Sequence, residues 1–224
     1  MRKYRRNNKS YLQAGNHDDV AEVYEDSVIS NYKRGDFIRE KYFELLDEVV
    51  SFMDLSPDLK ILDIGIGTGF LTEKMPIGIQ VYGIDISSKM MRVLKKKKLN
   101  VKLKYGSFLN IPFKDNSFNR IVSTYAFHHI PYEYQKSAFD EMNRALKPGG
   151  FLVIGDLMFK NKSSKNELRS YLKHLGKNDT VANIDEEYFA FIKDSSAYLK
   201  NIGFKTEYIQ ISTLSWVLKG VKIG

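Results

Sequence analysis

The chain has 224 residues, 43% of them hydrophobic and 28% charged, which is enough for one sizeable folded domain. Its formal net charge is +8, and it has no cysteine, which excludes disulfides, thiolate nucleophiles and cysteine metal sites and is typical of a reducing compartment. No apolar run approaches the roughly 20 residues of a membrane span, and the basic start, MRKYRRNNKS, lacks the apolar core of a secretory signal, so we expect a cytoplasmic protein.

The N-terminal quarter is predicted to be helical. Residues 1–17 are polar and basic and are expected to be flexible, whereas residues 18–224 are expected to form a single domain. Apolar residues at helical spacing predict a short helix from Asp18 to about Ser30 and a longer helix from Phe37 to Phe52. We expect residues 18–56, which contain these helices, to form a helical lid.

Strands and helices then alternate. The predicted helices begin at Gly69, at Ser87 and at Tyr132, the last of them running to Leu146. This alternation predicts a parallel sheet with helices on both faces. The predicted strands are Lys60–Ile64, Gln80–Ile84, Val101–Tyr105, Phe118–Thr124 and Phe151–Ile154.

The pattern changes after the fifth of these strands. Residues 160–200 are predicted to be a helical insertion, with helices around Leu168–Leu175 and near Asp194–Asn201. The strands Phe204–Ile211 and Leu214–Val221 are joined by a short link, which indicates a hairpin. The predicted fold class is therefore α/β: a doubly wound, mostly parallel sheet of seven strands with an antiparallel final strand.

The segment ILDIGIGTGF places Gly65, Gly67 and Gly69 between the first of the alternating strands and its helix, where doubly wound sheets bind cofactors. The dinucleotide pattern G-x-G-x-x-G fails in both frames, because its third glycine would fall on Phe70 or Thr72. The phosphate-loop pattern also fails, because no Gly-Lys-Ser/Thr closes the turn. A different ligand is therefore expected.

Two carboxylates narrow the choice of ligand. Asp63, two residues before the first glycine, would repel a pyrophosphate at a helix N-terminus and suits a cationic amino group. Asp85, at the end of the second strand, is placed to accept hydrogen bonds from a ribose. A ribose and an ammonium group without a phosphate describe S-adenosylmethionine.

Four segments, in this order and spacing, resemble the class I S-adenosylmethionine-dependent methyltransferases: ILDIGIGTG, GIDIS, DNSFNRIVSTYAFHHI and LKPGGFLVIGD. The resemblance covers roughly residues 18–224 and implies a Rossmann-like methyltransferase fold with S-adenosyl-L-methionine as its cofactor. It also implies that the glycine loop packs against the methionine part, that Asp85 binds the ribose hydroxyls and that Ile86 lies beside the adenine.

One position departs from the family. An acidic residue often follows the third strand and accepts a hydrogen bond from the adenine amino group, whereas this chain has Ser107 there, followed by Phe108. A hydroxyl accepts more weakly than a carboxylate, so we expect slightly weak cofactor binding. The expected cofactor-binding residues are Tyr24, Asp63, Gly65, Gly67, Gly69, Asp85, Ile86, Ser107, Phe108 and Thr124; no metal ligands are assigned.

The segment STYAFHHI after the fourth strand bears on the methyl acceptor. It lacks the Asn/Asp-Pro-Pro-aromatic turn of methyltransferases that act on exocyclic amines, and it resembles the branch that acts on small molecules, quinones and lipid precursors. His128 and His129 are the candidate catalytic residues, because a histidine can take a proton from an acceptor hydroxyl, thiol or amine. The alternative is that they line the pocket or cap a helix.

Two further residues are assigned with alternatives. Tyr24 lies in a segment similar to the family's N-terminal cover, where a tyrosine often lies over the cofactor, although a core tyrosine on an amphipathic helix fits as well. Asp156, at the end of the fifth strand, is placed either to contact the substrate or to cap a helix.

The sequence therefore predicts methyl transfer to a small-molecule acceptor by a monomer or homodimer. Basic clusters at Arg2 to Arg6 and at Lys95 to Lys98 leave an RNA or protein methyltransferase as an alternative. Nucleic acid is not favoured, because a lysine run is usually the solvated face of a helix. A non-catalytic S-adenosylmethionine-binding protein is the third hypothesis.

Overall fold

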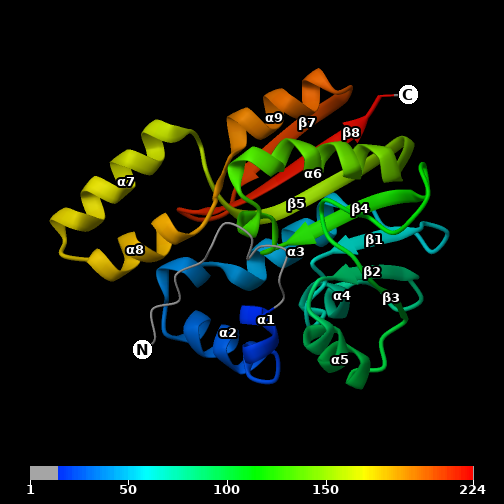
Figure 1. The fold of residues 1–224 in the computed structure, drawn as a ribbon, viewed down its shortest axis with the longest axis horizontal. Helices are drawn as coiled ribbons and strands as arrows, with labels where there is room; N and C mark the ends of the chain where they lie inside the picture. Colours follow the sequence, from blue (N-terminus) through cyan, green and yellow to red (C-terminus); the bar gives the residue numbers. More distant parts are fainter. Residues whose placement is uncertain (1–14, 224) are drawn as a thin grey trace.

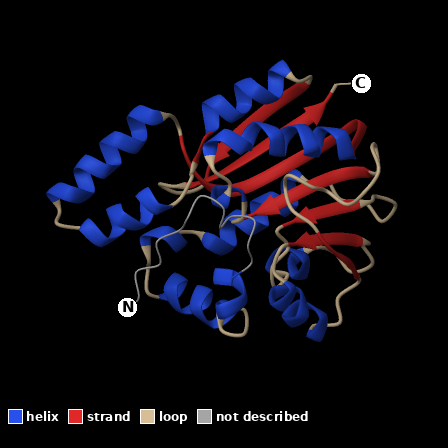
Figure 2. Cartoon of the chain, viewed as in Figure 1, coloured by secondary structure: helices blue, strands red, loops and turns tan. Residues whose placement is uncertain are grey.

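The computed structural model describes residues 15–223 as an α/β protein built on an eight-stranded sheet (Figures 1 and 2). Seven strands follow the order β3-β2-β1-β4-β5-β8-β7, and β6 pairs with β5 off this path. The predicted fold class is confirmed. The strands are β1 (Ile61–Ile64), β2 (Val81–Asp85), β3 (Val101–Tyr105), β4 (Phe118–Thr124), β5 (Leu146–Phe159), β6 (Ala190–Phe191), β7 (Phe204–Gln210) and β8 (Ser215–Lys222).

The last strand, β8, runs antiparallel between β5 and β7 rather than at the edge of the sheet. Residues 215–218 of β8 are all buried, as expected for a strand with neighbours on both sides. By contrast, β7 carries exposed polar residues, among them Lys205 and Glu207, which suits an edge strand. The hairpin predicted from the sequence therefore places its second strand inside the sheet.

Helices cover both faces of the sheet. The helices α3 (Tyr42–Phe52), α4 (Phe70–Lys74) and α5 (Ser88–Lys96) contribute to one apolar core, and α6 (Tyr132–Ala145) and α9 (Ile192–Asn201) to the other. Burial on both faces explains why the four residues of β1 are all inaccessible to solvent, Asp63 included.

The remaining helices lie beyond the carboxyl ends of the parallel strands (Figure 1). The predicted helix over 18–30 is two helices, α1 (Gly15–Val20) and α2 (Tyr24–Lys33), and α1 begins inside the segment predicted to be flexible. The helix expected from Phe37 is interrupted, because Lys41 adopts a left-handed conformation with φ of 53° between η2 (Phe37–Arg39) and α3. The insertion contains α7 (Lys162–His174) and α8 (Asn178–Glu186), of which the sequence indicated only the first.

Strand β5 is longer than predicted. It continues through Asp156 because β8 pairs with it as far as Leu157 and β6 pairs with Met158 and Phe159. Asp156 therefore lies within the strand and not at its end. The basic cluster Arg2 to Arg6 lies outside the described residues.

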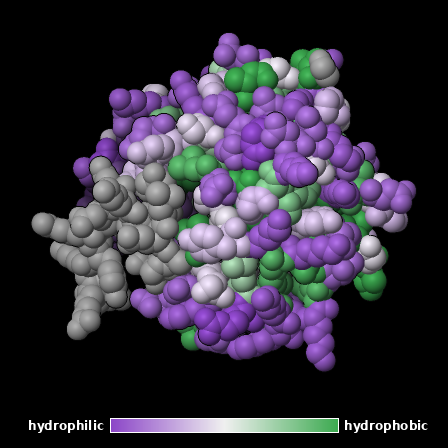
Figure 3. Space-filling model, turned by 45° about the vertical axis from the view of Figure 1, so that its right-hand side comes forward, coloured by the Kyte–Doolittle hydropathy of each residue, from purple (hydrophilic) through white to green (hydrophobic). Residues whose placement is uncertain are grey.

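Over residues 15–223, no helix is long and apolar enough to cross a bilayer. The face drawn in Figure 3 mixes hydrophilic side chains with smaller hydrophobic patches.

Gly155 of β5 tests the packing of the sheet against α3. A Cβ at this position would overlap Val49 and lie 2.7 Å from Cδ2 of Leu45. We expect Gly155→Ala to lower the free energy of unfolding by about 1–3 kcal/mol through overpacking, measured by urea unfolding. Gly220→Ala in β8 is the control, because its nearest contact is a Phe204 ring atom at 3.1 Å. Equal losses in both variants would contradict this packing.

Candidate functional site

A cavity of about 540 Å³ lies at the carboxyl ends of β1, β2 and β4. Its walls come from the loop after β1, the ends of β2 and β4, the N-terminal elements α2 and η2, and the segment around α8. Because β1 has β2 on one side and β4 on the other, the chain winds in opposite directions from this point. Ligands of doubly wound sheets bind at such a switch point.

The loop after β1 forms one wall with its main chain. Gly65, Gly67 and Gly69 have φ values of 73°, 55° and 90°, which lie in the left-handed region that glycine tolerates best. A Cβ at Gly65 would lie only 2.5 Å from Cβ of Ala126, in the loop after β4. Because glycine has no side chain, the loop after β1 can contact the loop after β4, and its main-chain atoms face the cavity.

Asp85 joins this loop to the end of β2. Its Oδ2 accepts the N–H of Gly67 at 2.8 Å, and its Oδ1 accepts the N–H of Ser87 at 2.7 Å. Burial raises the pKa of Asp85, although the bonds from Ser87 and Gly67 oppose that shift. A carboxylate has about four acceptor positions, so Asp85 keeps capacity for ribose hydroxyls.

Asp63 is the one predicted cofactor-binding residue that does not line the cavity. It lies beneath the glycine loop, 2% exposed, and its Oδ1 has no hydrogen-bond partner within the described chain. Burial, and after it the charge of Asp85, raises the pKa of Asp63 to about 8. A cationic group at the loop would reverse this shift and supply the missing partner.

The other end of the cavity is suited to an adenine. Ser107 and Phe108 line it together with Ile86 and Met90. The Oγ of Ser107 accepts the N–H of Leu109 at 3.3 Å and keeps a second lone pair. This end is largely apolar, with one hydroxyl at the position predicted from the sequence.

The N-terminal elements α2, η2 and α3 contribute aromatic rings and one guanidinium group to the cavity wall. Tyr24 lines the cavity, and Tyr42 stacks on Tyr125 with ring centroids 4.2 Å apart. Arg39 lies over both stacked rings, at 5.4 and 5.7 Å from their centroids. Arg39, Tyr42 and Tyr125 were not assigned to the site from the sequence.

Asp156 holds the loop that carries the histidine pair. Its Oδ2 accepts the N–H groups of Phe127 and His128 at 2.7 and 3.1 Å, and its Oδ1 lies 2.5 Å from Nδ1 of His128. Asp156 is fully buried and does not line the cavity, so it caps the short helix η3 (Phe127–His129). Burial lowers the pKa of His128, but attraction to Asp156 and their hydrogen bond outweigh this, and the net shift is upward.

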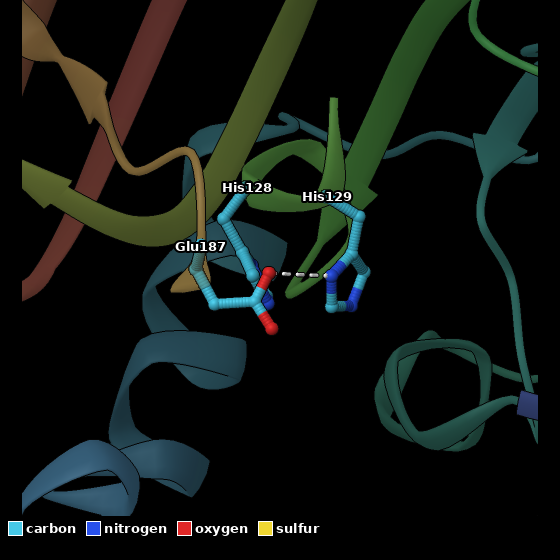
Figure 4. Close-up of side chains that lie close together, drawn as sticks. All are labelled: His128, His129 and Glu187. Atoms are coloured by element: carbon cyan, nitrogen blue, oxygen red, sulfur yellow. Dashed lines mark hydrogen bonds and ion pairs between the residues drawn. The ribbon is translucent and has the colours of Figure 1, made fainter. Parts of the chain in front are cut away.

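Glu187 faces the two histidines from the segment after α8 (Figure 4). Its Oε2 lies 3.1 Å from Nδ1 of His129, and the imidazole centroids of His128 and His129 are 4.0 Å apart. The N–H of Tyr188 donates to the carbonyl of His128 at 3.0 Å, which places Glu187 beside the pair. Neither Glu187 nor this contact has a signal in the sequence.

The structure thus gathers most of the predicted residues around one cavity. Both histidines and every predicted cofactor-binding residue except Asp63 line it. The residues that line it are Tyr24, Gly65, Gly67, Gly69, Asp85, Ile86, Ser107, Phe108, Thr124, His128 and His129.

Known proteins similar to this chain are methyltransferases. A methyltransferase domain family matches residues 62–154. An uncharacterized methyltransferase of Oceanobacillus iheyensis is 31% identical over 208 residues, which are 92% of this chain and 96% of that protein. A relative from Alkaliphilus oremlandii, also an uncharacterized methyltransferase, is 29% identical over the same shares.

Solved structures share the fold at lower identity. A SAM-dependent methyltransferase from Aquifex aeolicus superposes with a TM-score of 0.59 at 19% identity, covering 85% of this chain and 97% of that one. The [4+2]-cyclase SpnF reaches 0.62 at 15% identity, covering 81% of each chain. The fold alone therefore does not define the reaction.

The fold and the cavity define an α/β protein with a nucleoside-cofactor site at its switch point. The chain belongs to the class I S-adenosylmethionine-dependent methyltransferases. Its cofactor is S-adenosylmethionine, and the residues present fit that molecule: Oδ1 of Asp63, buried without a hydrogen-bond partner among residues 15–223, the carboxylate of Asp85 at the end of β2, and a largely apolar end of the cavity beside Ser107.

The raised pKa of Asp63 predicts a pH-dependent stability. An unfolded aspartate loses its proton near pH 4, whereas folded Asp63 keeps it to about pH 8, so the folded state binds more protons between these values. The free energy of unfolding therefore falls as pH rises through this range.

Asp63→Asn removes this titration. Without cofactor, we expect it to exceed the wild type in stability by about 3–5 kcal/mol near pH 8 and by no more than about 1.5 kcal/mol near pH 5. Denaturant unfolding at both pH values measures the difference. A variant less stable than the wild type near pH 8 would contradict the raised pKa.

Ser107→Asp tests the adenine end. A carboxylate accepts more strongly than a hydroxyl, so we expect S-adenosylhomocysteine to bind about three- to tenfold more tightly in calorimetry. Ser107→Ala is the control and should not tighten binding. Unchanged affinity in Ser107→Asp would show that residue 107 does not face the adenine amino group.

Proposed function

We propose that this methyltransferase acts on a small-molecule acceptor. The observation that carries the proposal is the cavity, whose volume of about 540 Å³ lies within the range of small-ligand sites and includes the space for the cofactor. Aromatic lid residues such as Tyr24 and Tyr42 form part of its wall. The remaining space favours an acceptor of modest size over a polymer.

The charge pattern also favours a small acceptor over nucleic acid. Lys97 pairs with Glu25 and Glu73 at 2.5 and 3.0 Å, and Lys96 pairs with Glu22 at 3.0 Å. Two lysines of the basic run thus hold the N-terminal lid and are neutralised by acidic partners. A phosphate backbone would have to compete with these ion pairs.

We assign the acceptor end of the cavity to His128 and His129. Asp156 holds Nδ1 of His128, which leaves Nε2 as the nitrogen for a ligand. Methyl transfer depends mainly on alignment and exclusion of water. In this proposal, residues 18–224 form a single domain. Its residues 18–56 and 160–200 form a lid that covers both the cofactor and the acceptor.

The acceptor class is tested by incubating a cell extract with methyl-labelled S-adenosylmethionine. We expect label in the low-molecular-weight fraction with the wild type and none with Asp85→Ala, which lacks the ribose-binding carboxylate. Label confined to RNA or protein would overturn the small-molecule proposal, and absence of label in every fraction would favour a non-catalytic protein.

The labelled acceptor then tests the histidine assignment. We expect His128→Gln to lower kcat by about 100-fold while the calorimetric cofactor affinity stays within about threefold, because His128 acts on the acceptor and not on the cofactor. His174→Gln, in α7 and outside the cavity, is the matched control and should keep wild-type kcat. Full turnover by His128→Gln would remove His128 from the mechanism.

A further inference from the structure

We propose that His128, His129 and Glu187 bind a divalent transition-metal ion such as Zn²⁺ at the acceptor end of the cavity. Each residue offers one ligand atom, and the three atoms lie within 4.8 Å of one another. All three residues line the cavity. No metal ligands were predicted from the sequence, because Glu187 is far from the histidines along the chain and lies beside them only in the folded protein.

The distance between two of the ligand atoms is already close to that found around a bound metal ion. Nδ1 of His129 and Oε2 of Glu187 are 3.1 Å apart. Two atoms that ligate one zinc ion at about 2.0–2.1 Å lie roughly 3–3.5 Å apart, so this pair already has the required separation. Closing a separation of 4.8 Å to this distance takes a combined shift of about 1.3–1.8 Å, within reach of the side chains of His129 and Glu187, which are 25% and 21% exposed.

Asp156 supports the site from behind. Metal-ligating histidines usually donate their other N–H to a carboxylate, which fixes the ring and its tautomer. His128 donates in this way from Nδ1 to Oδ1 of Asp156 at 2.5 Å, and Asp156 is itself fixed by the N–H groups of Phe127 and Leu157.

The types of ligand atom narrow the choice of metal ion. Two imidazole nitrogens and one carboxylate oxygen suit Zn²⁺, Fe²⁺, Co²⁺ or Ni²⁺, whereas Mg²⁺ and Ca²⁺ prefer oxygen ligands alone. Three protein ligands leave one coordination position open, as in catalytic zinc sites. That position faces the cavity, because all three ligands line it.

An open position suggests the acceptor class. A hydroxyl, thiol or amine that ligates the ion would be held near the cofactor with its pKa lowered. This role rests on the proposed function, whereas binding of the ion does not.

Calorimetry with the full chain, stripped by a chelator and titrated with ZnCl₂, tests the site. We expect one ion per chain with a Kd of about 10 µM or tighter, and at least about tenfold weaker binding in His129→Gln and Glu187→Gln. The matched controls are His174→Gln and Glu133→Gln, which remove a histidine and a glutamate that do not line the cavity; both should bind as the wild type does.

Thermal unfolding in EDTA shows whether each variant is folded, and MgCl₂ should give no comparable binding. The inference is overturned if the wild type binds Zn²⁺ no more tightly than about 1 mM, or if His129→Gln and Glu187→Gln bind as the wild type does. Zinc binding without methyl transfer would contradict the proposed function alone, and methyl transfer without zinc binding would contradict this inference alone.

Discussion

The main chain after β1 lies so close to the loop after β4 that Gly65 has no room for a side chain, since a Cβ there would come within 2.5 Å of Ala126. This close approach brings the cofactor loop and the histidine loop to one cavity. It requires left-handed main-chain conformations at alternate positions, which glycine supplies at low cost. The carboxylate of Asp85 then joins the glycine loop to the neighbouring strand.

Buried carboxylates fix the chemistry around this contact. Oδ1 of Asp63 has no hydrogen-bond partner among residues 15–223, and the pKa of Asp63 is raised to about 8, so this carboxyl suits a cationic cofactor. Asp156, equally buried, is fully engaged with main-chain N–H groups and with His128. Asp63 is thus suited to favour binding of the cationic methyl donor. Asp156 orients His128, the residue that we assign to the acceptor. The segment after α8 adds Glu187, which forms a three-residue cluster with His128 and His129.

The central sheet and the glycine loop that lines the cavity were predictable from the sequence, because apolar periodicity and the glycine and aspartate motifs are local. The helices beyond the carboxyl ends of the strands were not. A left-handed residue at Lys41 leaves no trace in helical periodicity, and α8 is too polar for its buried residues, Val181 and Ile184, to give a clear pattern. Asp156 was expected at a strand end because pairing of β5 with β6 and β8 is a long-range property. Glu187 reaches the histidines through a main-chain bond between Tyr188 and His128, which no spacing reveals.

The central claim is that the cavity at the end of β1 binds S-adenosylmethionine. The most direct measurement is a crystal structure of the wild-type chain with S-adenosylhomocysteine, supported by calorimetry with NADH as the competing nucleotide. The account predicts the ribose on Asp85, the adenine beside Ser107 and Phe108, and no binding of NADH. A ligand bound elsewhere, or preferential binding of NADH, would contradict it.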